Sequence, residues 1–365
     1  MIRKKILTSA FSNLYTDQRI EKVCATLHNG GYDIELIGNN WGGEEPIQRP
    51  YKAHRIKLMS KSLKTGYIEF NWKLYFELEK RITSDTILHA NDVDALWPNY
   101  LLAKKYKLPL VFDSHEIFSE MPAVQGRFSQ KVWRAIEKKV IPNLNYMMTA
   151  SYSYAEWFKS HYGIEAVVVQ NLPKQLKIRL NEMKNDPKII LYQGAINPFR
   201  GIDKVVKAME LIEGAEFHIA GAGPKKEEYE ALVQELQLSH RVKFLGKLHP
   251  EDLRKITQKA DVGLSVEENG GPSYLYSFPN KVSDYIQARV PVVLINFPEM
   301  KRVIDQFSVG EIIENHNSET IAKAINKVLS NGKEFYKTEL ERASQELCWE
   351  KESQKVLDLF AKAAL

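Results

Sequence analysis

Residues 277–294, SFPNKVSDYIQARVPVVL, decide the fold prediction for this chain, because they predict a loop, a helix and a buried strand in succession. Either Ser277 or Asn280 could cap the helix, and Pro279 suits its first turn. The apolar, mostly β-branched run at 292–295 is typical of a buried parallel strand. A helix that leads directly into such a strand is the repeating unit of an α/β domain.

Lys281 and Asp284 lie three residues apart, so they share one helix face near its N-terminus. Backbone amides and a lysine at this end of a helix can bind phosphate, and a carboxylate can bind the hydroxyl groups of a ribose. The pair therefore predicts a site for an anionic ligand that carries a sugar. A surface ion pair, on a helix whose other face packs in a core, is the alternative interpretation.

The composition predicts a two-domain protein without a cysteine framework. The chain has 365 residues, 44% of them hydrophobic, so two domains of about 170–190 residues are expected. A net charge of +5 suits anionic small molecules or a membrane surface, and predicts no nucleic-acid partner. Cys24 and Cys348 predict no disulfide framework. The basic residues 1–5 precede too short an apolar run for a signal peptide, so we expect a cytoplasmic location with at most peripheral membrane contact.

The first half alternates predicted strands and helices. A strand at 5–9, a helix at 20–27 and a strand at 34–37 form a βαβ unit, whose first loop lacks the glycine-rich dinucleotide fingerprint. Two later strands end in polar residues at His89 and His115, where α/β sheets bind ligands. Further predictions for this half are irregular chain at 39–60, a helix that covers at least 72–82, helices at 98–107, 128–140 and up to 162, a strand end at 86–92 that brings His89 and Asp92 to a loop, and strands at 110–113, 146–150 and 166–170.

The predicted helix at 128–140 is amphipathic and carries four basic side chains: Lys131, Arg134, Lys138 and Lys139. Such a helix could contact anionic lipid. A solvated basic face over buried Val132, Ile136 and Val140 is the alternative.

The second half begins after a polar, proline-flanked segment at 171–187, which we assign as the linker. It predicts a doubly wound α/β domain. The predicted strands are 188–192, 217–220, 242–245, 261–265, 292–295 and 309–313, and the other predicted helices are 202–212, 225–237, 250–259, 300–306 and 321–329.

Arg200 stands in a glycine-containing loop before a predicted helix, with Lys204 one turn further on. Gly194, just after the preceding strand, permits a close approach of the backbone. Amide groups with a guanidinium suit a diphosphate, which arginine can contact with two parallel hydrogen bonds. An ordinary surface arginine in a connecting loop is the alternative.

Two further groups have candidate chemical roles. Glu267, in a loop that runs to Pro272, could contact a sugar or act electrostatically, although a solvated acidic turn has the same composition. His115 with Glu116 could form an acid–base pair or orient a sugar hydroxyl, whereas a lone histidine is often structural. Paired histidines, CxxC and a P-loop are absent from the sequence, so neither a metal site nor an ATPase is predicted.

The chain resembles the family-four retaining glycosyltransferases of the GT-B fold over nearly its whole length. The motifs that carry the resemblance are Asp17–Ile20, His89–Asp92, Asp113–Glu116, Asn171–Pro173, Tyr192–Gly194, Phe199–Asp203, His218–Pro224, Val242–Gly246, Ala260–Leu264 and Pro279–Ile286 with Pro291–Val293. The resemblance implies an α/β fold of two doubly wound Rossmann-like domains facing across a cleft. Residues 1–172 would form the acceptor-side domain, residues 186–345 the donor domain, and a helix at 349–365 would pack back on the first.

The same resemblance implies transfer of a sugar, with retention, from a nucleotide sugar to an acceptor hydroxyl, without a bound metal or other cofactor. The donor would be a UDP- or GDP-sugar. The acceptor would be a saccharide or a lipid-linked saccharide in cell-surface polysaccharide or glycoconjugate synthesis. The implied roles are diphosphate binding by Arg200 and Lys281, ribose binding by Asp284, base contact around Leu245, a place beside the donor sugar for Glu267, and a place near the reacting centre for His115.

Two departures from the family pattern leave alternatives open. Tyr276 stands where the first of two glutamates is usual, with Asp284 at the second, and Ala195 and Ile196 stand where a first cation is usual. Ser12, Lys204 or a helix N-terminus is therefore expected to help neutralise the diphosphate. The alternatives are a nucleotide-sugar epimerase of the same architecture and a catalytically inactive nucleotide-sugar-binding subunit.

Overall fold

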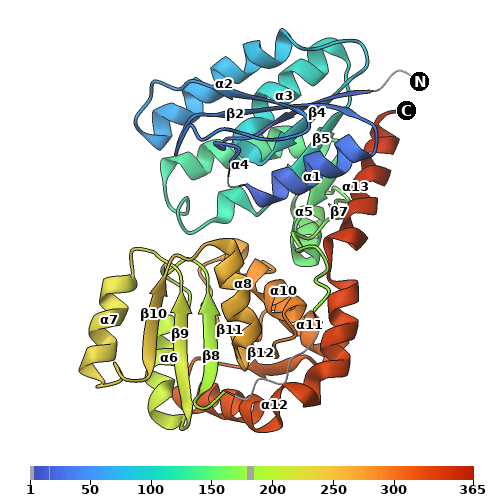
Figure 1. Ribbon diagram of the computed structural model, residues 1–365. Coiled ribbons are helices and arrows are strands. Elements are labelled where there is room, and N and C mark those ends of the chain that lie inside the picture. The colour runs from blue at the N-terminus through green and yellow to red at the C-terminus, as the bar shows by residue number, and fades with distance from the viewer. Residues whose placement is uncertain (1–3, 16, 179–184) are drawn as a thin grey trace. The chain divides into compact units, whose positions relative to one another are not determined.

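The computed structural model describes residues 4–15, 17–178 and 185–365. The chain divides into two compact units, Met1–Asn171 with Glu352–Leu365 (unit 1) and Leu172–Lys351 (unit 2). Each unit has its own parallel sheet with helices packed on it, as Figure 1 shows. The predicted α/β fold of two Rossmann-like domains is confirmed. Part of the predicted linker, residues 179–184, lies outside the described residues.

Unit 1 is built on a seven-stranded sheet with the strand order β3-β2-β1-β4-β5-β6-β7. The order of the chain reverses between β1 and β4, which is where such sheets bind ligands. The strands are β1 (Lys5–Ser9), β2 (Asp33–Asn39), β3 (Lys52–Ile56), β4 (Thr86–Asn91), β5 (Leu110–Ser114), β6 (Tyr146–Thr149) and β7 (Val167–Val168). The helices are α1 (Gln18–Asn29), α2 (Leu63–Glu79), α3 (Val93–Tyr106), α4 (Phe128–Val140), α5 (Tyr152–Tyr162) and the C-terminal α13 (Trp349–Ala363).

Helices α2, α3 and α4 form one layer on the sheet of unit 1. Each connects a strand to a parallel strand further along the sheet in the same direction, and right-handed crossovers place such helices on one face. Helix α3 contacts both α2 and α4, so the three helices lie side by side. Their sides that face away from the sheet therefore form one continuous surface.

Three elements of unit 1 differ from the prediction. Helix α2 begins at Leu63, nine residues before the predicted start, and ends at Glu79 rather than at Ile82. The edge strand β3 lies in a segment predicted to be irregular, because its polar side chains give no apolar alternation. Helix α3 begins at Val93 rather than Pro98, which lies inside it. A proline cannot bond to the carbonyl four residues earlier. The side chain of Asn71 donates to that carbonyl, on Asp94, at 2.7 Å and satisfies it from α2.

Helix α4 has the predicted bounds but not the predicted buried face. Its buried side chains are Trp133, Glu137 and Val140, whereas Val132 is exposed and Ile136 only half-buried. The prediction of a basic face over buried Val132 and Ile136 is therefore wrong. These apolar side chains lie on the exposed side of the helix.

Unit 2 is built on a six-stranded sheet with the order β10-β9-β8-β11-β12-β13, whose chain order reverses between β8 and β11. The strands are β8 (Lys188–Gln193), β9 (Ala215–Ala220), β10 (Val242–Gly246), β11 (Val262–Ser265), β12 (Val292–Ile295) and β13 (Gly310–Ile313). The helices are α6 (Ile202–Ala208), α7 (Lys226–Glu235), α8 (Pro250–Lys259), α9 (Pro272–Leu275), α10 (Asn280–Gln287), α11 (Pro298–Phe307) and α12 (Ser318–Glu346). All the predicted strands are present.

Residues 277–294 fold, as predicted, into a loop, helix α10 and most of the buried strand β12. Its predicted cap is wrong: Pro279 holds the N-cap position without a side-chain bond, and the hydroxyl of Ser277 donates to the carbonyl of Tyr274. Tyr285 is fully buried and donates from its hydroxyl to the carbonyl of Leu191 on β8 at 3.1 Å. This bond fixes α10 against the strand that leads to the candidate site.

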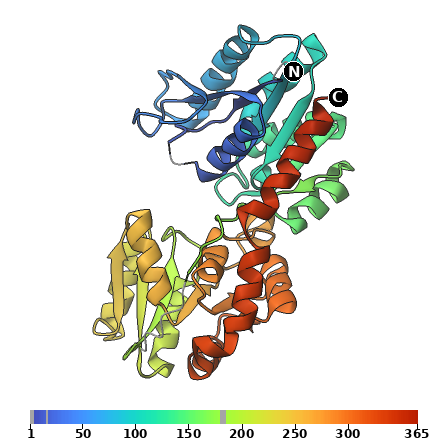
Figure 2. The same cartoon turned by 45° about the vertical axis from the view of Figure 1, so that its right-hand side comes forward.

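Helix α12 is much longer than the predicted 321–329. Gly332 has non-helical backbone angles, with φ 70° and ψ 167°, so two helices meet at a kink there. Figure 2 shows α12 and then α13 as consecutive helices in the last, red part of the chain. No helix in the described part of the chain has both the length and the apolar character needed to cross a bilayer.

Candidate functional site

The candidate site of unit 2 lies where β8 and β11 end side by side. Gly194 directly follows β8, and Arg200 stands in the loop between β8 and α6. Glu267 follows β11, and Lys281 lies in the first turn of α10. The backbone amide of Glu268 donates to the carbonyl of Phe199 at 3.0 Å, so the two loops are joined. Residues from three separate segments therefore meet at the topological switch point of this sheet.

Glu267 is the centre of this cluster and is almost completely buried. Its carboxylate accepts from Lys281 Nζ at 2.6 Å and from the hydroxyl of Ser265 at 2.8 Å. Arg200 Nη1 lies 3.9 Å from the same carboxylate oxygen that binds Lys281. Burial would raise the pKa of Glu267, but the Lys281 ammonium outweighs it and the pKa is lowered. Glu267 is thus an ionised carboxylate shared by two cations, and the interpretation as a solvated acidic turn is wrong.

Arg200 is held partly exposed beside Glu267. Its guanidinium lies over the ring of Tyr274, 4.8 Å from the ring centroid, and its Nε has no hydrogen-bond partner among the described atoms. The next residue, Gly201, has φ 68°, and a Cβ atom there would lie 2.1 Å from the carbonyl oxygen of Val266. Only glycine therefore lets this loop approach the residue before Glu267.

Lys281 is buried rather than displayed on the surface. Its ammonium lies over the ring of Tyr192, 4.2 Å from the centroid, and its Cε lies 3.5 Å from the point where a Cβ on Gly194 would be. Because Lys281 pairs with Glu267, the alternative of a surface ion pair with Asp284 is wrong. The lysine brings its charge to the end of β8.

The other predicted site residues lie on several elements of the two units. Asp284 accepts from the side chain of Gln193 at 3.1 Å, at the end of β8. Lys204 pairs with Asp203 at 3.0 Å and lies 4.0 Å from Glu268, so it is directed to neighbouring carboxylates. Leu245, on β10, is partly buried against the core of unit 2. Ser12 belongs to unit 1, where its hydroxyl accepts from the amide of Leu14 at 3.1 Å.

His115 is the centre of a second cluster, in unit 1. Its Nδ1 lies 3.2 Å from a carboxylate oxygen of Asp92, and its Nε2 lies 3.4 Å from Asp113 and 3.3 Å from the side-chain oxygen of Asn91. Burial would lower the pKa of His115, but the carboxylates of Asp92 and Asp113 outweigh it and raise the pKa to about 9. His115 is therefore an imidazolium at neutral pH, with both ring nitrogens as donors.

Asp113 also binds Arg19 on α1. Arg19 Nε and Nη2 donate to the two oxygens of Asp113 at 3.0 and 2.6 Å, and Nη1 donates to the carbonyl of Val169 at 2.6 Å. Both side chains are buried. This bidentate pair joins α1 to β5 and to the chain just after β7, and it fixes one side of His115.

The carboxylates of Asp92 and Asp94 complete the second cluster. Asp92 has φ 57°, a conformation that is strained for a residue with a side chain. Its carboxylate accepts from the amide of His115 at 2.9 Å, and this bond holds the strained loop. Burial raises the pKa of Asp94 well above its usual range, and one of its oxygens has no partner among the described atoms.

Sequence reasoning missed four contributions to these clusters. It named neither the Arg19–Asp113 pair nor Asp94, and it did not assign Tyr192 and Tyr274 as the rings beside the cations. The signal that could have suggested the two tyrosines is residue type, because arginine and lysine side chains often lie over tyrosine rings. Sequence spacing does not predict such contacts, because the partners lie 74 and 89 positions apart along the chain.

Comparison with known families identifies the chain. The model described as Glycosyltransferase Family 4 matches residues 18–172, and the model described as Glycosyl transferases group 1 matches residues 174–345. The two matches adjoin at the division between the two units and together cover most of the chain. The chain belongs to this glycosyltransferase family, which confirms the resemblance at the level of the family.

Curated relatives are similar over parts of the chain. An uncharacterized glycosyltransferase of Methanocaldococcus jannaschii is 28% identical over 152 residues, which cover 41% of this chain and 37% of that protein. A D-inositol 3-phosphate glycosyltransferase of Corynebacterium glutamicum is 18% identical over 292 residues, 71% of this chain and 67% of that one. The matched segment spans roughly a third of the length of the first three relatives.

Solved structures show the same fold over the whole chain. Sucrose-phosphate synthase from Thermosynechococcus elongatus superposes with a TM-score of 0.82 at 17% identity, covering 99% of both chains. The Anabaena protein HepE, solved in complex with UDP, superposes with a TM-score of 0.74 at 13% identity, covering 99% of this chain and all of that one. At these identities the likeness supports the GT-B fold.

Proposed function

We propose that this protein transfers a sugar, with retention of anomeric configuration, from a nucleoside-diphosphate sugar to an acceptor hydroxyl. The observation that carries the proposal is the convergence of Arg200 and Lys281 on Glu267 at the switch point of the unit 2 sheet. Two cations around one buried carboxylate leave a net positive charge. A diphosphate can bind there by accepting hydrogen bonds from the exposed part of the Arg200 guanidinium.

Lys281 would supply the positive charge that is missing at Ala195 and Ile196, where the family usually has a basic side chain. Its ammonium lies beside Gly194, one residue before Ala195, although it comes from a helix far along the chain. With Arg200 it would neutralise the diphosphate as the bond to the anomeric carbon breaks. Such stabilisation of a departing anion is often the largest contribution to catalysis. Lys204, paired with Asp203 and near Glu268, would assist at longer range.

Glu267 acts in this proposal by positioning the two cations beside the donor sugar. Its carboxylate is already bonded to Lys281 and Ser265, so it is poorly suited to accept a proton. The proton of the acceptor hydroxyl would pass to the oxygen of the departing diphosphate, while the acceptor oxygen forms the new bond on the same face of the anomeric carbon. Asp284 would bind the ribose, with Leu245 beside the base.

His115 would bind a sugar hydroxyl as a hydrogen-bond donor. Its raised pKa keeps the ring protonated at neutral pH, which makes it a poor general base and a strong donor. Ser12, in the loop after β1, would contribute a further hydroxyl to the donor. The acceptor would be a saccharide or lipid-linked saccharide used in cell-surface polysaccharide or glycoconjugate synthesis, at the cytoplasmic side of a membrane.

The first experiment is calorimetric titration of the protein with uridine, guanosine and adenosine diphosphates. Uridine diphosphate is the first candidate because HepE was solved with UDP and with UDP-glucose. We expect micromolar binding of one nucleotide and roughly 10- to 100-fold weaker binding to Arg200→Ala and to Lys281→Ala, since each removes a charged hydrogen bond to phosphate. The exposed Lys323→Ala on α12 is the matched control and should bind as the wild type does.

The outcomes separate the proposed transferase from its two alternatives. Failure of all three nucleotides to bind would contradict a nucleotide-sugar donor. If one nucleotide binds, its sugar donors are then incubated with and without acceptors. An isomerised donor formed without acceptor would identify an epimerase. Donor binding without turnover over a broad set of saccharide acceptors would identify an inactive binding subunit, which the tyrosine at position 276 would explain.

A further inference from the structure

The layer formed by α2, α3 and α4 exposes large apolar side chains on the side away from the sheet. On α2, Ile68, Trp72 and Phe76 are spaced by four residues, so they form a stripe along one face, and Trp72 is 63% exposed. Leu101 is exposed on α3. Side chains of this size normally pack in a core or against a partner.

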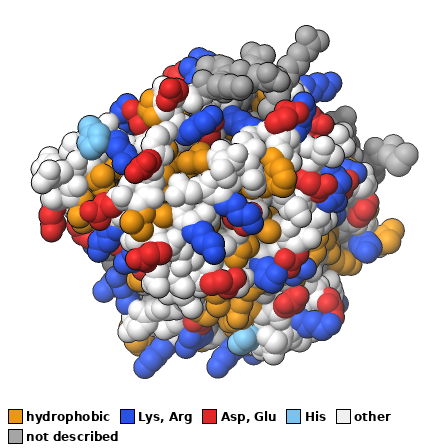
Figure 3. All heavy atoms as spheres, turned by 90° about the horizontal axis from the view of Figure 1, so that it is seen from below, with side chains coloured by type: hydrophobic (Ala, Val, Ile, Leu, Met, Phe, Trp, Pro, Cys, Tyr) orange, Lys and Arg blue, Asp and Glu red, His pale blue; other side chains and the backbone are white. Residues whose placement is uncertain are grey.

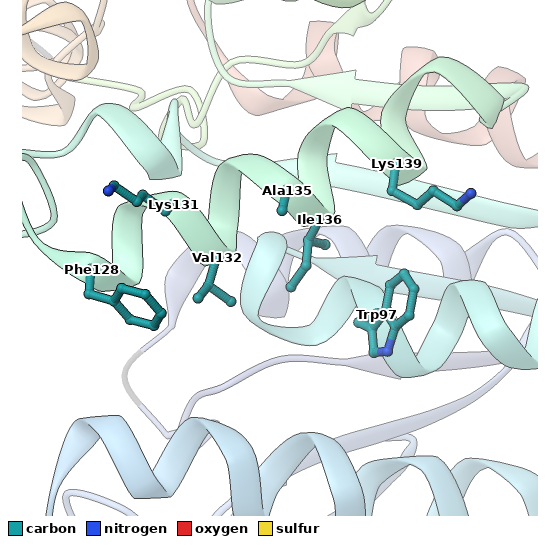
Figure 4. A pocket seen from close by; sticks show the side chains of 7 residues that line it. All are labelled: Trp97, Phe128, Lys131, Val132, Ala135, Ile136 and Lys139. Carbon is teal, nitrogen blue, oxygen red and sulfur yellow. The ribbon is translucent and has the colours of Figure 1, made fainter.

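Helix α4 adds the most exposed aromatic residue of this surface. Phe128 is 79% exposed, and Val132 follows one turn later at 42%. Figure 4 shows Phe128, Val132 and Ile136 on one side of α4, above Trp97 of α3. These side chains, with Lys131, Ala135 and Lys139, line a shallow apolar hollow of about 510 Å³ between the two helices. The two lysines place positive charge at the edge of the hollow.

The most exposed charges of this surface have one sign. Every charged side chain of α2, α3 and α4 that is exposed, rather than half-buried or buried, is a lysine or arginine, among them Lys64, Lys131 and Lys139; of these basic residues, Lys105 and Arg134 pair with Glu79 and Glu120. The carboxylates on these helices are buried or half-buried, and those of α2 pair with nearby basic side chains. On the face of the molecule drawn in Figure 3, by contrast, acidic and basic side chains are interspersed.

We propose that the outer face of α2, α3 and α4 is a docking surface for an anionic lipid bilayer. Exposed aromatic and aliphatic side chains would enter the boundary between headgroups and acyl chains, and the surrounding lysines would lie among acidic headgroups. A second copy of the chain fits this surface poorly, because a two-fold contact would bring two basic faces together. The charge complementarity therefore favours a lipid surface over self-association.

The test is flotation of the full-length protein with vesicles of phosphatidylcholine alone and of phosphatidylcholine mixed with phosphatidylglycerol. The wild type should float with the phosphatidylglycerol vesicles at low salt, and less as salt screens the lysines. Phe128→Ser and Trp72→Ser should each bind roughly tenfold more weakly, because each removes one apolar side chain from the lipid. Lys131→Glu combined with Lys139→Glu should remove the preference for phosphatidylglycerol.

Matched controls lie on α12, in unit 2. Phe335 is 70% exposed, so Phe335→Ser removes an equally exposed aromatic side chain, and Lys323→Glu reverses an exposed lysine there. Both variants should float as the wild type does. All these positions are exposed, so thermal unfolding should be nearly unchanged, and a melting curve on each variant checks this.

Three results would overturn the docking surface. They are absence of flotation with phosphatidylglycerol vesicles, full retention of binding by Phe128→Ser and Trp72→Ser, and an equal loss in Phe335→Ser. Sedimentation that showed a dimer dissociated by Phe128→Ser would assign the surface to a second copy and overturn the lipid proposal. Vesicle binding needs no nucleotide, so its failure is distinguishable from failure of the proposed donor site in calorimetry.

Discussion

The two charged clusters are opposite in arrangement. In unit 2 one carboxylate, Glu267, lies between two cations, Lys281 and Arg200. In unit 1 one cation, His115, lies between two carboxylates, Asp92 and Asp113. Both stand just past the carboxyl ends of parallel strands, at the ligand-binding edge of a doubly wound sheet. One architecture therefore presents a carboxylate between two cations in unit 2 and, in unit 1, a cation between two carboxylates, one of which Arg19 also neutralises.

The difference indicates different ligands for the two edges. The cluster of unit 2 leaves part of Arg200 exposed, so it can gain an anion without unfolding. The cluster of unit 1 is locked by the buried Arg19–Asp113 pair and presents an imidazolium between acids, which suits neutral hydroxyl groups. We therefore expect the carboxylates of the unit 1 cluster mainly to stabilise the fold, and Glu267 of unit 2 mainly to change the affinity for the ligand.

The largest expected effect is that of Asp113→Asn. This change leaves the buried guanidinium of Arg19 without its carboxylate, which should lower the free energy of unfolding by about 3–5 kcal/mol. Urea unfolding measures the loss. Asp305→Asn, in an exposed pair with Lys301, is the control and should cost less than about 1 kcal/mol. A similarly small loss for Asp113→Asn would remove the distinction between a structural cluster and a binding cluster.

The next effect is a pH dependence that comes from His115. Its pKa in the folded protein is about 9, above the ordinary value of 6.5, so the protonated ring stabilises the fold. This stabilisation is fully present below about pH 6.5 and is lost as the pH rises through 9. The unfolding free energy of the wild type should therefore exceed that of His115→Gln at low pH. This difference should shrink by on the order of 1–3 kcal/mol as the pH rises through this range.

Urea unfolding of both proteins at several pH values measures this advantage. The exposed His240→Gln controls for the replacement of a histidine by glutamine elsewhere in the protein. An advantage of the wild type over His115→Gln that stays constant or grows as the pH rises would contradict an imidazolium held between two acids.

The smallest expected effect is on nucleotide affinity in Glu267→Gln. The carboxylate of Glu267 competes with a diphosphate for Lys281 and Arg200, and it also repels the diphosphate. The Glu267→Gln variant, whose side chain is neutral and of similar shape, should therefore bind the nucleotide about three- to tenfold more tightly than the wild type. Calorimetry on the same nucleotide measures the change, with Glu334→Gln on α12 as a control on an exposed acid. Weaker binding to Glu267→Gln would contradict the prediction, because it would mean that the positioning of the two cations by Glu267 outweighs its repulsion of the diphosphate.

The fold was predictable to a large extent because its signals are local. Apolar β-branched runs such as 292–295 specify buried parallel strands, and helices between them specify the crossovers. The prediction failed where the local signal was weak or ambiguous. Strand β3 is a polar edge strand, and Pro98 suggested a helix start although Asn71 allows it inside α3. Both outcomes depend on neighbours that the local sequence does not show.

The candidate site was predictable as a set of residues but not as a set of contacts. Arg200, Glu267 and Lys281 were each named from loops after strands, and the structure brings these three together. Their arrangement around one carboxylate was not predicted, because Lys281 had an apparent partner in Asp284 only three residues away. In the folded protein Lys281 is buried near the end of β8, where its ammonium donates to the carboxylate of Glu267.

The sequence by itself determined the fold class, the family and the strand ends at which charged residues collect, because these follow from periodicity, composition and contiguous motifs. Only the tertiary structure decided which charges pair, that His115 is protonated, and that Val132 and Phe128 are exposed beside lysines. The physical reason is that pKa values and exposure depend on every group within several ångströms, whatever its distance along the chain. A helix pattern shows that two faces differ, and the packing of its neighbours decides which of them meets water.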